Sequence, residues 1–282
     1  MFRLILLLAL AAAPFTVPAQ SEAEVRAQAQ ASMVVSGSLD IEPDGLVSSL
    51  ALEKEDQLPA YVVRAARNAV ATWRFEPVIL DGVARPVRLF IRLRVVAVPA
   101  DDGGLTLSIG GVSFLDRDVP ATDGFESIRQ LPPEYPYYAL ERNASGDVYL
   151  LLEINREGRV ARSAVERVNL RGVADEPTMD TLRRHFSEAA LKAARRWHFR
   201  PPSTGPDAGE PSWTARVPVS YVMHGTVQSD QYGKWTAYVP GPVQSAPWLE
   251  DRAADANDAI ASGSIQLVGA GPKLLTPLQP EG

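Results

Sequence analysis

The chain has 282 residues, of which 46% are hydrophobic and 22% are charged, and its formal net charge is −6. This length suits one large domain or two small ones, and the apolar content is sufficient for packed cores. The sequence contains no cysteine, which excludes disulfides, thiolate metal sites and a cysteine nucleophile. It also has no basic stripe of the kind that predicts a nucleic-acid partner.

The first element in chain order is an N-terminal apolar run. Arg3 supplies a positive start, residues 4–13 are all apolar, and residues 17–19 (Val-Pro-Ala) offer small side chains to signal peptidase. This layout predicts a secretory signal peptide over residues 1–19, so that the mature protein begins near Gln20 in the periplasm. The alternative is an uncleaved membrane anchor. A membrane span needs roughly 20 apolar residues, however, and a proline interrupts this run.

Two segments of the chain repeat. Residues 65–77 and 189–201 align without a gap, and both end in Trp-x-Phe-x-Pro. Upstream of them, residues 41–47 (IEPDGLV) match residues 154–160 (INREGRV). Such a repeat predicts two copies of one supersecondary unit. The shared positions at the helix ends are Trp73, Phe75 and Pro77 in the first copy and Trp197, Phe199 and Pro201 in the second.

Each copy has the periodicity of two strands, a helix and a last strand. Glycine-containing turns separate the first two strands, and alanine-rich helices follow, each ending in a tryptophan that we expect to anchor a core. The last strands alternate, with Arg88, Arg92 and Arg94 on one face in the first copy and Arg216 on the corresponding face in the second. One-sided burial of this kind predicts an α+β fold, in which each β-β-α-β module is a small antiparallel sheet with its helix on one face. The face with Arg88, Arg92 and Arg94 either receives an acidic partner or, as we favour, is solvated.

The remaining segments are predicted to be connections. We expect modules over residues 33–98 and 134–223, joined by an acidic linker over residues 99–133, in which residues 106–109 form one short strand. Residues 224–282 are rich in Gly, Pro, Ala and Asp, so they are expected to form a partly disordered tail.

The second copy resembles the C-terminal domain of the TonB family. Residues 133–139 (PEYPYYA) match the family's Tyr-Pro-x-x-Ala entry helix, and residues 217–219 (VPV) match its last strand. The first copy carries the turn, the helix and the last strand but no entry helix, so it resembles a trimmed and diverged module. The residues that carry the resemblance in the second copy are Tyr135, Pro136, Ala139, Gly158, Trp197, Phe199 and Pro201.

The resemblance implies a protein-binding function in the cell envelope, with no cofactor. In the family, the last strand is an edge that accepts an extended peptide, and Pro218 is typical of an edge because proline cannot donate to a central ladder. The partner, such as an outer-membrane receptor, is then expected on residues Arg216, Val217, Pro218, Val219, Ser220 and Tyr221. The alternative is an ordinary strand that the tail or the other module caps.

Two further questions remain open at this level. Tyr135, Tyr137 and Tyr138 either form a recognition patch or, as we favour, pack a short helix on its sheet.

The second functional hypothesis is a membrane-anchored energy transducer of the TonB type, on the periplasmic side of the inner membrane. TonB has an uncleaved anchor, a long Pro-rich spacer and one C-terminal domain. The cleavable leader, the missing spacer and the doubled domain therefore argue against this reading.

The sequence contains no recognisable enzyme motif of the common kinds. The three histidines show no metal-binding spacing, and the chain has no Gly-x-Ser-x-Gly elbow and no Walker loop. Residues 40–45 (DIEPDG) imitate the start of an EF-hand loop, but position twelve is Ala51, so the loop is interpreted as a hairpin turn. We therefore expect no catalytic site and no metal. A third hypothesis is an enzyme whose site spans both modules.

Overall fold

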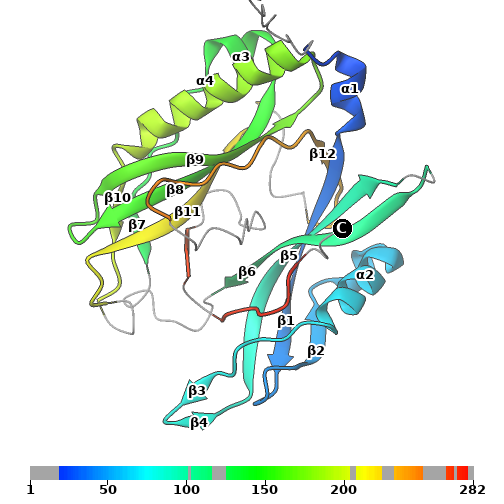
Figure 1. The fold of residues 1–282 in the computed structure, drawn as a ribbon, viewed down its shortest axis with the longest axis vertical. Coiled ribbons are helices and arrows are strands. Elements are labelled where there is room, and N and C mark those ends of the chain that lie inside the picture. Colours follow the sequence, from blue (N-terminus) through cyan, green and yellow to red (C-terminus); the bar gives the residue numbers. More distant parts are fainter. Residues whose placement is uncertain are drawn as a thin grey trace, which may run out of the picture.

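The structure is a computed structural model, and it describes residues 19–100, 103–115, 125–203, 208–223, 232–249, 265–269 and 272–278. It is an α+β fold of antiparallel sheets with few helices (Figure 1). No helix within these described ranges is long and apolar enough to cross a membrane. The expected signal peptide lies outside the described residues, apart from Ala19.

The first sheet has five strands in the order β12-β1-β5-β6, with β2 also paired to β1. The helix α2 packs on it through Val62, Ala66 and Val70, which share one core with β1, β5 and β6. The strands are β1 (Gln30–Ile41), β2 (Val47–Leu52), β5 (Val87–Pro99), β6 (Leu105–Leu115) and β12 (Thr236–Tyr238). The 3-10 helix η1 (Glu55–Gln57) and α2 (Ala60–Val70) follow β2, and the hairpin of β3 (Ile79–Leu80) and β4 (Val83–Ala84) precedes β5.

The second sheet has four strands in the order β13-β11-β8-β9. Its strands are β8 (Ser145–Asn155), β9 (Val160–Arg171), β11 (Ser212–Tyr221) and β13 (Gln266–Leu267). Its helices are α3 (Tyr137–Glu141) and α4 (Glu176–Ala194), and a separate pair is formed by β7 (Glu126–Arg129) and β10 (His198–Arg200). The helix α4 begins after Asp175, whose side chain accepts a hydrogen bond from the backbone N–H of Thr178 at 2.9 Å.

Both hairpin turns form the same backbone hydrogen bond with the segment that follows the helix. Phe75 N–H donates to the carbonyl of Gly45 at 2.8 Å, and Phe199 N–H donates to that of Gly158 at 2.9 Å. The two glycines have φ values of +83° and +74°, and a Cβ atom there would lie 2.1 Å and 1.8 Å from the carbonyl oxygens of Phe75 and Phe199. Glycine is therefore required at both turns, for its backbone conformation and for space.

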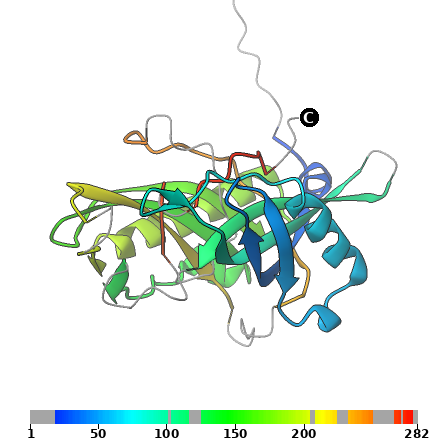
Figure 2. The same cartoon turned by 90° about the horizontal axis from the view of Figure 1, so that it is seen from below.

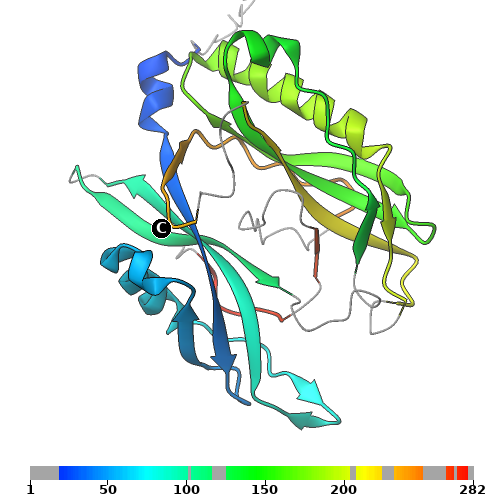
Figure 3. The same ribbon diagram turned by 180° about the vertical axis from the view of Figure 1, so that it is seen from behind.

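The two tryptophans lie in separate hydrophobic cores. Trp73 is 2% exposed in the core of the first sheet, and Trp197 is 2% exposed in that of the second. The indole Nε1 of Trp197 also donates to the carbonyl of Leu131 at 2.8 Å, so the end of α4 is bonded to the segment before α3. The helices α2 and α4 lie on the outer sides of their sheets (Figure 3).

The expectation of one-sided burial is wrong for part of each sheet. Arg88 is exposed, but Arg94 and Arg216 are each only 4% exposed. Arg94 Nη1 donates to the hydroxyl of Tyr149 on β8 at 3.3 Å, and its guanidinium lies 4.7 Å from the ring centroid of Tyr238 on β12. The faces without helices are therefore turned toward each other, and Arg94 is buried where they meet.

The C-terminal segments, coloured orange to red, run beside both sheets (Figure 2). The strand β12 pairs with β1 at residues 30–32, and the next residue, Val239, exchanges two backbone hydrogen bonds with Leu170 of β9 at 2.8 and 3.0 Å. Farther on, Ala246 and Leu249 pack against Leu151 on the face of β8 that α4 does not cover. These segments thus supply the burial that local periodicity does not predict.

The strand β6 is longer than the short strand expected over residues 106–109. It spans Leu105–Leu115 and pairs with β5 along its length, with a register shift between Arg94 and Val95. Gly110 lies at this shift, where a Cβ atom would come within 2.4 Å of the side chain of Val96. The glycines that suggested a loop therefore form a bulge inside a strand.

Candidate strand-acceptor edge

The last strand of the second sheet, β11, contains all six residues expected to bind a partner. One face of it belongs to the core, because Val217 is fully buried, Val219 is 6% exposed and Tyr221 is 3% exposed. The hydroxyl of Tyr221 donates to the carbonyl of Phe186 at 3.2 Å, and burial raises the pKa of this phenol. These three side chains stabilise the packing of α4 and are not accessible to a partner.

The other face of β11 is also occupied. Arg216 forms a bidentate ion pair with Glu166 of β9, with Nε–Oε2 and Nη2–Oε1 distances of 2.7 and 2.5 Å, and the two side chains are only 5% and 6% exposed. Pro218 is buried, and the hydroxyl of Ser220 donates to the carboxylate of Asp147. Binding on β11 would therefore use its backbone, because its side chains already have roles within the fold.

The outer edge of β11 is not entirely free, contrary to the reading of it as an open edge. The strand β13 pairs with it antiparallel, with Ala215 opposite Leu267 and Arg216 opposite Gln266. Val268 N–H also donates to the carbonyl of Thr214 at 2.8 Å. The alternative weighed from the sequence, that the tail caps this strand, therefore holds for this part of the edge.

The position of Pro218 is consistent with an edge. In an antiparallel ladder, the backbone groups of alternate residues point to opposite neighbours. The carbonyl of Thr214 points toward β13, so the backbone of Pro218, four residues on, points to the same outer side. Proline therefore removes no donor from the ladder with β8.

In the first sheet, the corresponding edge is occupied over most of its length. Its third strand along the chain, β5, pairs with β1 on one side and with β6 on the other, and residues 90–99 all pair with residues of β6. In both sheets, therefore, the outer edge of the strand that follows the helix accepts an antiparallel strand. The difference is in extent, because β13 pairs with β11 at two positions only.

The entry-helix motif is mainly structural, although one of its tyrosines is exposed. The Tyr135 hydroxyl donates to the carbonyl of Ala144 at 2.5 Å, and its ring contacts Tyr221 edge-on at 5.6 Å between centroids. Tyr138 stacks on His185 of α4 at 5.0 Å. Tyr137, in contrast, is 74% exposed. Of the other motif positions, Ala139 is fully buried and Phe199 is 1% exposed, whereas Pro77 is exposed.

A hollow of about 340 Å³ lies between the start of β8, the end of β9 and the start of α4. Its lining includes Arg171, Met179 and Leu182, and the guanidinium of Arg171 is paired with Asp147 at 2.9 Å. This hollow is formed by the second half of the chain alone. Among the described residues, no group of three or more His, Asp or Glu side chains is placed to hold a metal ion.

Of the two strands that cover these edges, sequence reasoning predicted only a short part of β6 and missed β13. The signal for β6 was the alternation on both sides of Gly110, which the glycines and the acidic surroundings obscured. The signal for β13 was the mostly apolar stretch of residues 265–268 (IQLV) within a segment of otherwise tail-like composition. Nothing local in that run indicates β11 as its neighbour.

Comparison with known proteins places a TonB-like region in the chain. It is 25% identical over 107 residues to Protein TonB from two strains of Xanthomonas campestris pv. campestris. This similarity covers 38% of the chain and 42% of each relative, so the chain matches less than half the length of these proteins. No family model matches the chain.

Proposed function

We propose that this chain is a TonB-like protein of the cell envelope that binds an extended segment of a protein partner by strand addition at the outer edge of β11. The observation that carries the proposal is β13, because its pairing with Ala215 and Arg216 gives this edge an added antiparallel strand. Strand addition draws its affinity from main-chain hydrogen bonds, which suits a strand whose side chains are buried on both faces.

In this proposal, the partner strand takes the place of β13. The chain's own strand is a weak competitor, since it pairs at two positions and adds one further hydrogen bond through Val268. A partner segment of ordinary strand length, about 5–6 residues, makes a longer ladder. The covalent attachment of β13 raises its effective concentration, so the partner is captured only when its ladder is the longer one.

The duplication of the module explains why the second copy is the acceptor. We take residues 33–98 and 134–223 as two TonB-C-like β-β-α-β modules. In the first copy, β6 pairs with β5 at residues 90–99, which leaves only the first three residues of that edge without a partner in β6. In the second copy, the corresponding edge carries only the short β13. We further propose that the protein is a periplasmic adaptor without catalytic activity, cofactor or metal, and that the partner is a component of the outer membrane.

A second candidate is a membrane-anchored energy transducer in which residues 1–19 are retained. The similarity to Protein TonB itself favours this candidate. In it, the same edge of β11 binds the partner, and only the attachment of the chain to the inner membrane differs. The N-terminus of the protein isolated from cells distinguishes the two.

The absence of natural cysteine permits a direct test. Directly opposed residues in an antiparallel pair lie at a separation that a disulfide can span. In the variant Ala215→Cys/Leu267→Cys, oxidation locks β13 onto the edge, so we expect the oxidised form to lose capture of envelope proteins and the reduced form to regain it. Each single-cysteine variant is the matched control and should be insensitive to oxidation. If the locked form captured the same partners as the reduced form, the β11 edge would not be the binding site.

A further inference from the structure

The start of the described chain packs against the second sheet, although it leads into the first. The helix α1 (Glu22–Ala27) directly precedes β1, yet Val25 is 4% exposed in the core that contains α4 (Figure 1). Ser21 and Glu24 form a complete capping box at the start of α1. The position of this segment is therefore well defined by its own contacts.

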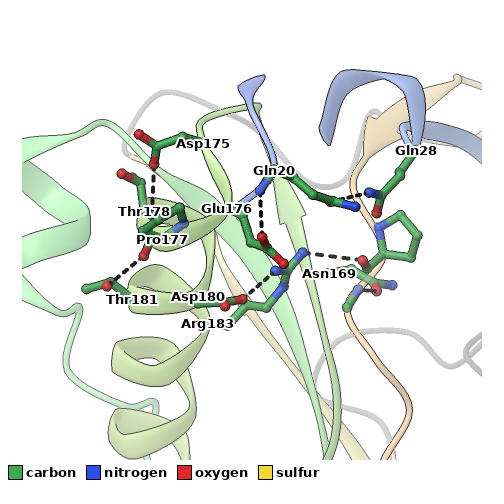
Figure 4. A network of polar contacts seen from close by, with 12 residues as sticks. Gln20, Gln28, Asn169, Asp175, Glu176, Pro177, Thr178, Asp180, Thr181 and Arg183 are labelled. Atoms are coloured by element: carbon green, nitrogen blue, oxygen red, sulfur yellow. Dashed lines mark hydrogen bonds and ion pairs between the residues drawn. The ribbon is translucent and has the colours of Figure 1, made fainter. Parts of the chain in front are cut away.

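Gln20 is held at three points (Figure 4). Its backbone nitrogen donates to Oε2 of Glu176 at 2.7 Å, and its carbonyl accepts from the backbone nitrogen of Glu176 at 3.1 Å. Its side-chain Oε1 accepts from Nε2 of Gln28 at 2.6 Å. This residue is the first one after the Val-Pro-Ala exit of the predicted signal peptide.

We propose that the chain is cleaved between Ala19 and Gln20 and that Glu176 is the receptor for the new α-ammonium group. Hydrolysis adds water across this peptide bond, so that Ala19 leaves as a carboxylate and the nitrogen of Gln20 becomes the α-amine, which is protonated at neutral pH. The existing bond from a neutral N–H to a carboxylate then becomes a hydrogen-bonded ion pair, in which both the donor and the acceptor are charged. The inference rests on the proposed location in the envelope, because signal peptidase acts on exported chains.

The surroundings of Glu176 suit a cation. Asp175 is engaged as the N-cap of α4, Asp180 pairs with Arg183 at 3.0 Å, and Glu24 closes the capping box of α1. Among the residues that the structure describes, no arginine or lysine lies within ion-pair distance of Glu176. The α-ammonium of Gln20 therefore supplies the missing counter-charge.

This arrangement also protects the new N-terminus from cyclisation. In a free N-terminal glutamine, the unprotonated α-amine attacks its own side-chain amide carbon and ammonia leaves, which produces pyroglutamate. Pairing with Glu176 keeps the nitrogen protonated, and the bond from Gln28 holds the side-chain amide. The mature protein is therefore expected to retain an open Gln20, and Glu176→Gln is expected to accelerate cyclisation.

The first measurement is N-terminal sequencing and intact mass of the full-length chain after expression in a Gram-negative host and purification from the envelope. We expect Gln20 at the N-terminus, without the loss of one ammonia. A different first residue, or rapid cyclisation in the wild-type protein, would overturn the proposal. Neither outcome depends on partner capture, so this proposal and the strand-addition proposal fail separately.

The second measurement compares Glu176→Gln with the exposed control Glu188→Gln in urea denaturation of the mature protein. A partly exposed ion pair contributes up to about 1 kcal/mol, so Glu176→Gln should lower the folding equilibrium constant about two- to fivefold at neutral pH. The α-amine has an ordinary pKa of about 7.7–8.0, and pairing with a carboxylate raises it in the folded state. The stabilisation is then complete below that range and is lost as the pH rises. An effect of Glu176→Gln that is the same at neutral and strongly alkaline pH would refute the ammonium pairing.

Discussion

The buried ion pair between Arg216 and Glu166 allows a strong quantitative test of the fold. The two side chains are 5% and 6% exposed, and they lie beneath the C-terminal segment, whose Gln244 N–H donates to the carbonyl of Glu166 at 2.7 Å. Arg216→Met leaves the carboxylate of Glu166 buried without its counter-charge. Removal of one partner from a buried pair costs about 3–5 kcal/mol, which is a large share of the roughly 5–15 kcal/mol that stabilises a domain.

The double variant Glu166→Leu/Arg216→Met isolates the cause. Replacing both charges with apolar side chains leaves no uncompensated charge, so we expect the double variant to lose less stability than Arg216→Met alone. The matched control is Arg162→Met, because Arg162 forms an ion pair with Glu153 on the same sheet but is 52% exposed. Water screens this pair from the side of its exposed arginine, so Arg162→Met should cost clearly less stability than Arg216→Met.

Urea denaturation followed by circular dichroism measures the free energy of unfolding of all three variants and the wild type. We expect Arg216→Met to be the least stable and Arg162→Met to be close to wild type. If Arg216→Met and Arg162→Met lost the same small amount, water would have access to the Arg216 pair. The conclusion that the C-terminal segment covers this face would then be wrong.

Two further predictions concern the core of each half and an exposed pair. Trp197→Ala should lower the stability of the second half by about 3–5 kcal/mol, and Trp73→Ala should do the same to the first, as measured by thermal melting; an unchanged melt for either would contradict its burial. The Arg88 guanidinium lowers the pKa of Asp40 to about 2. Solvent screens this exposed pair, so its contribution to stability is small. That contribution is present above the ordinary aspartate pKa and is lost as the pH falls toward 2. NMR titration should show this pKa return toward its ordinary value in Arg88→Met.

Much of each half was predictable from the sequence because its signals are local. The turn at Gly158 is determined by a glycine within a hairpin, and the strand Val160–Arg171 follows it as the alternation requires. Trp73 and Trp197 close helices whose apolar spacing of three to four residues predicts one buried face. The repeat strengthened each of these interpretations, since two sequences with the same pattern are constrained in the same way.

The sequence did not determine what covers each sheet. Arg94 and Arg216 occupy the positions of solvent-facing residues in an alternating strand, and only the approach of the other sheet and of the C-terminal segments buries them. The pairing of residues 30–32 with residues 236–238 joins parts of the chain that are about two hundred residues apart, so no local pattern encodes it. The same holds for β13 on β11 and for Gln20 on Glu176. Each of these contacts depends on the shape and charge of a surface that neither segment contains by itself.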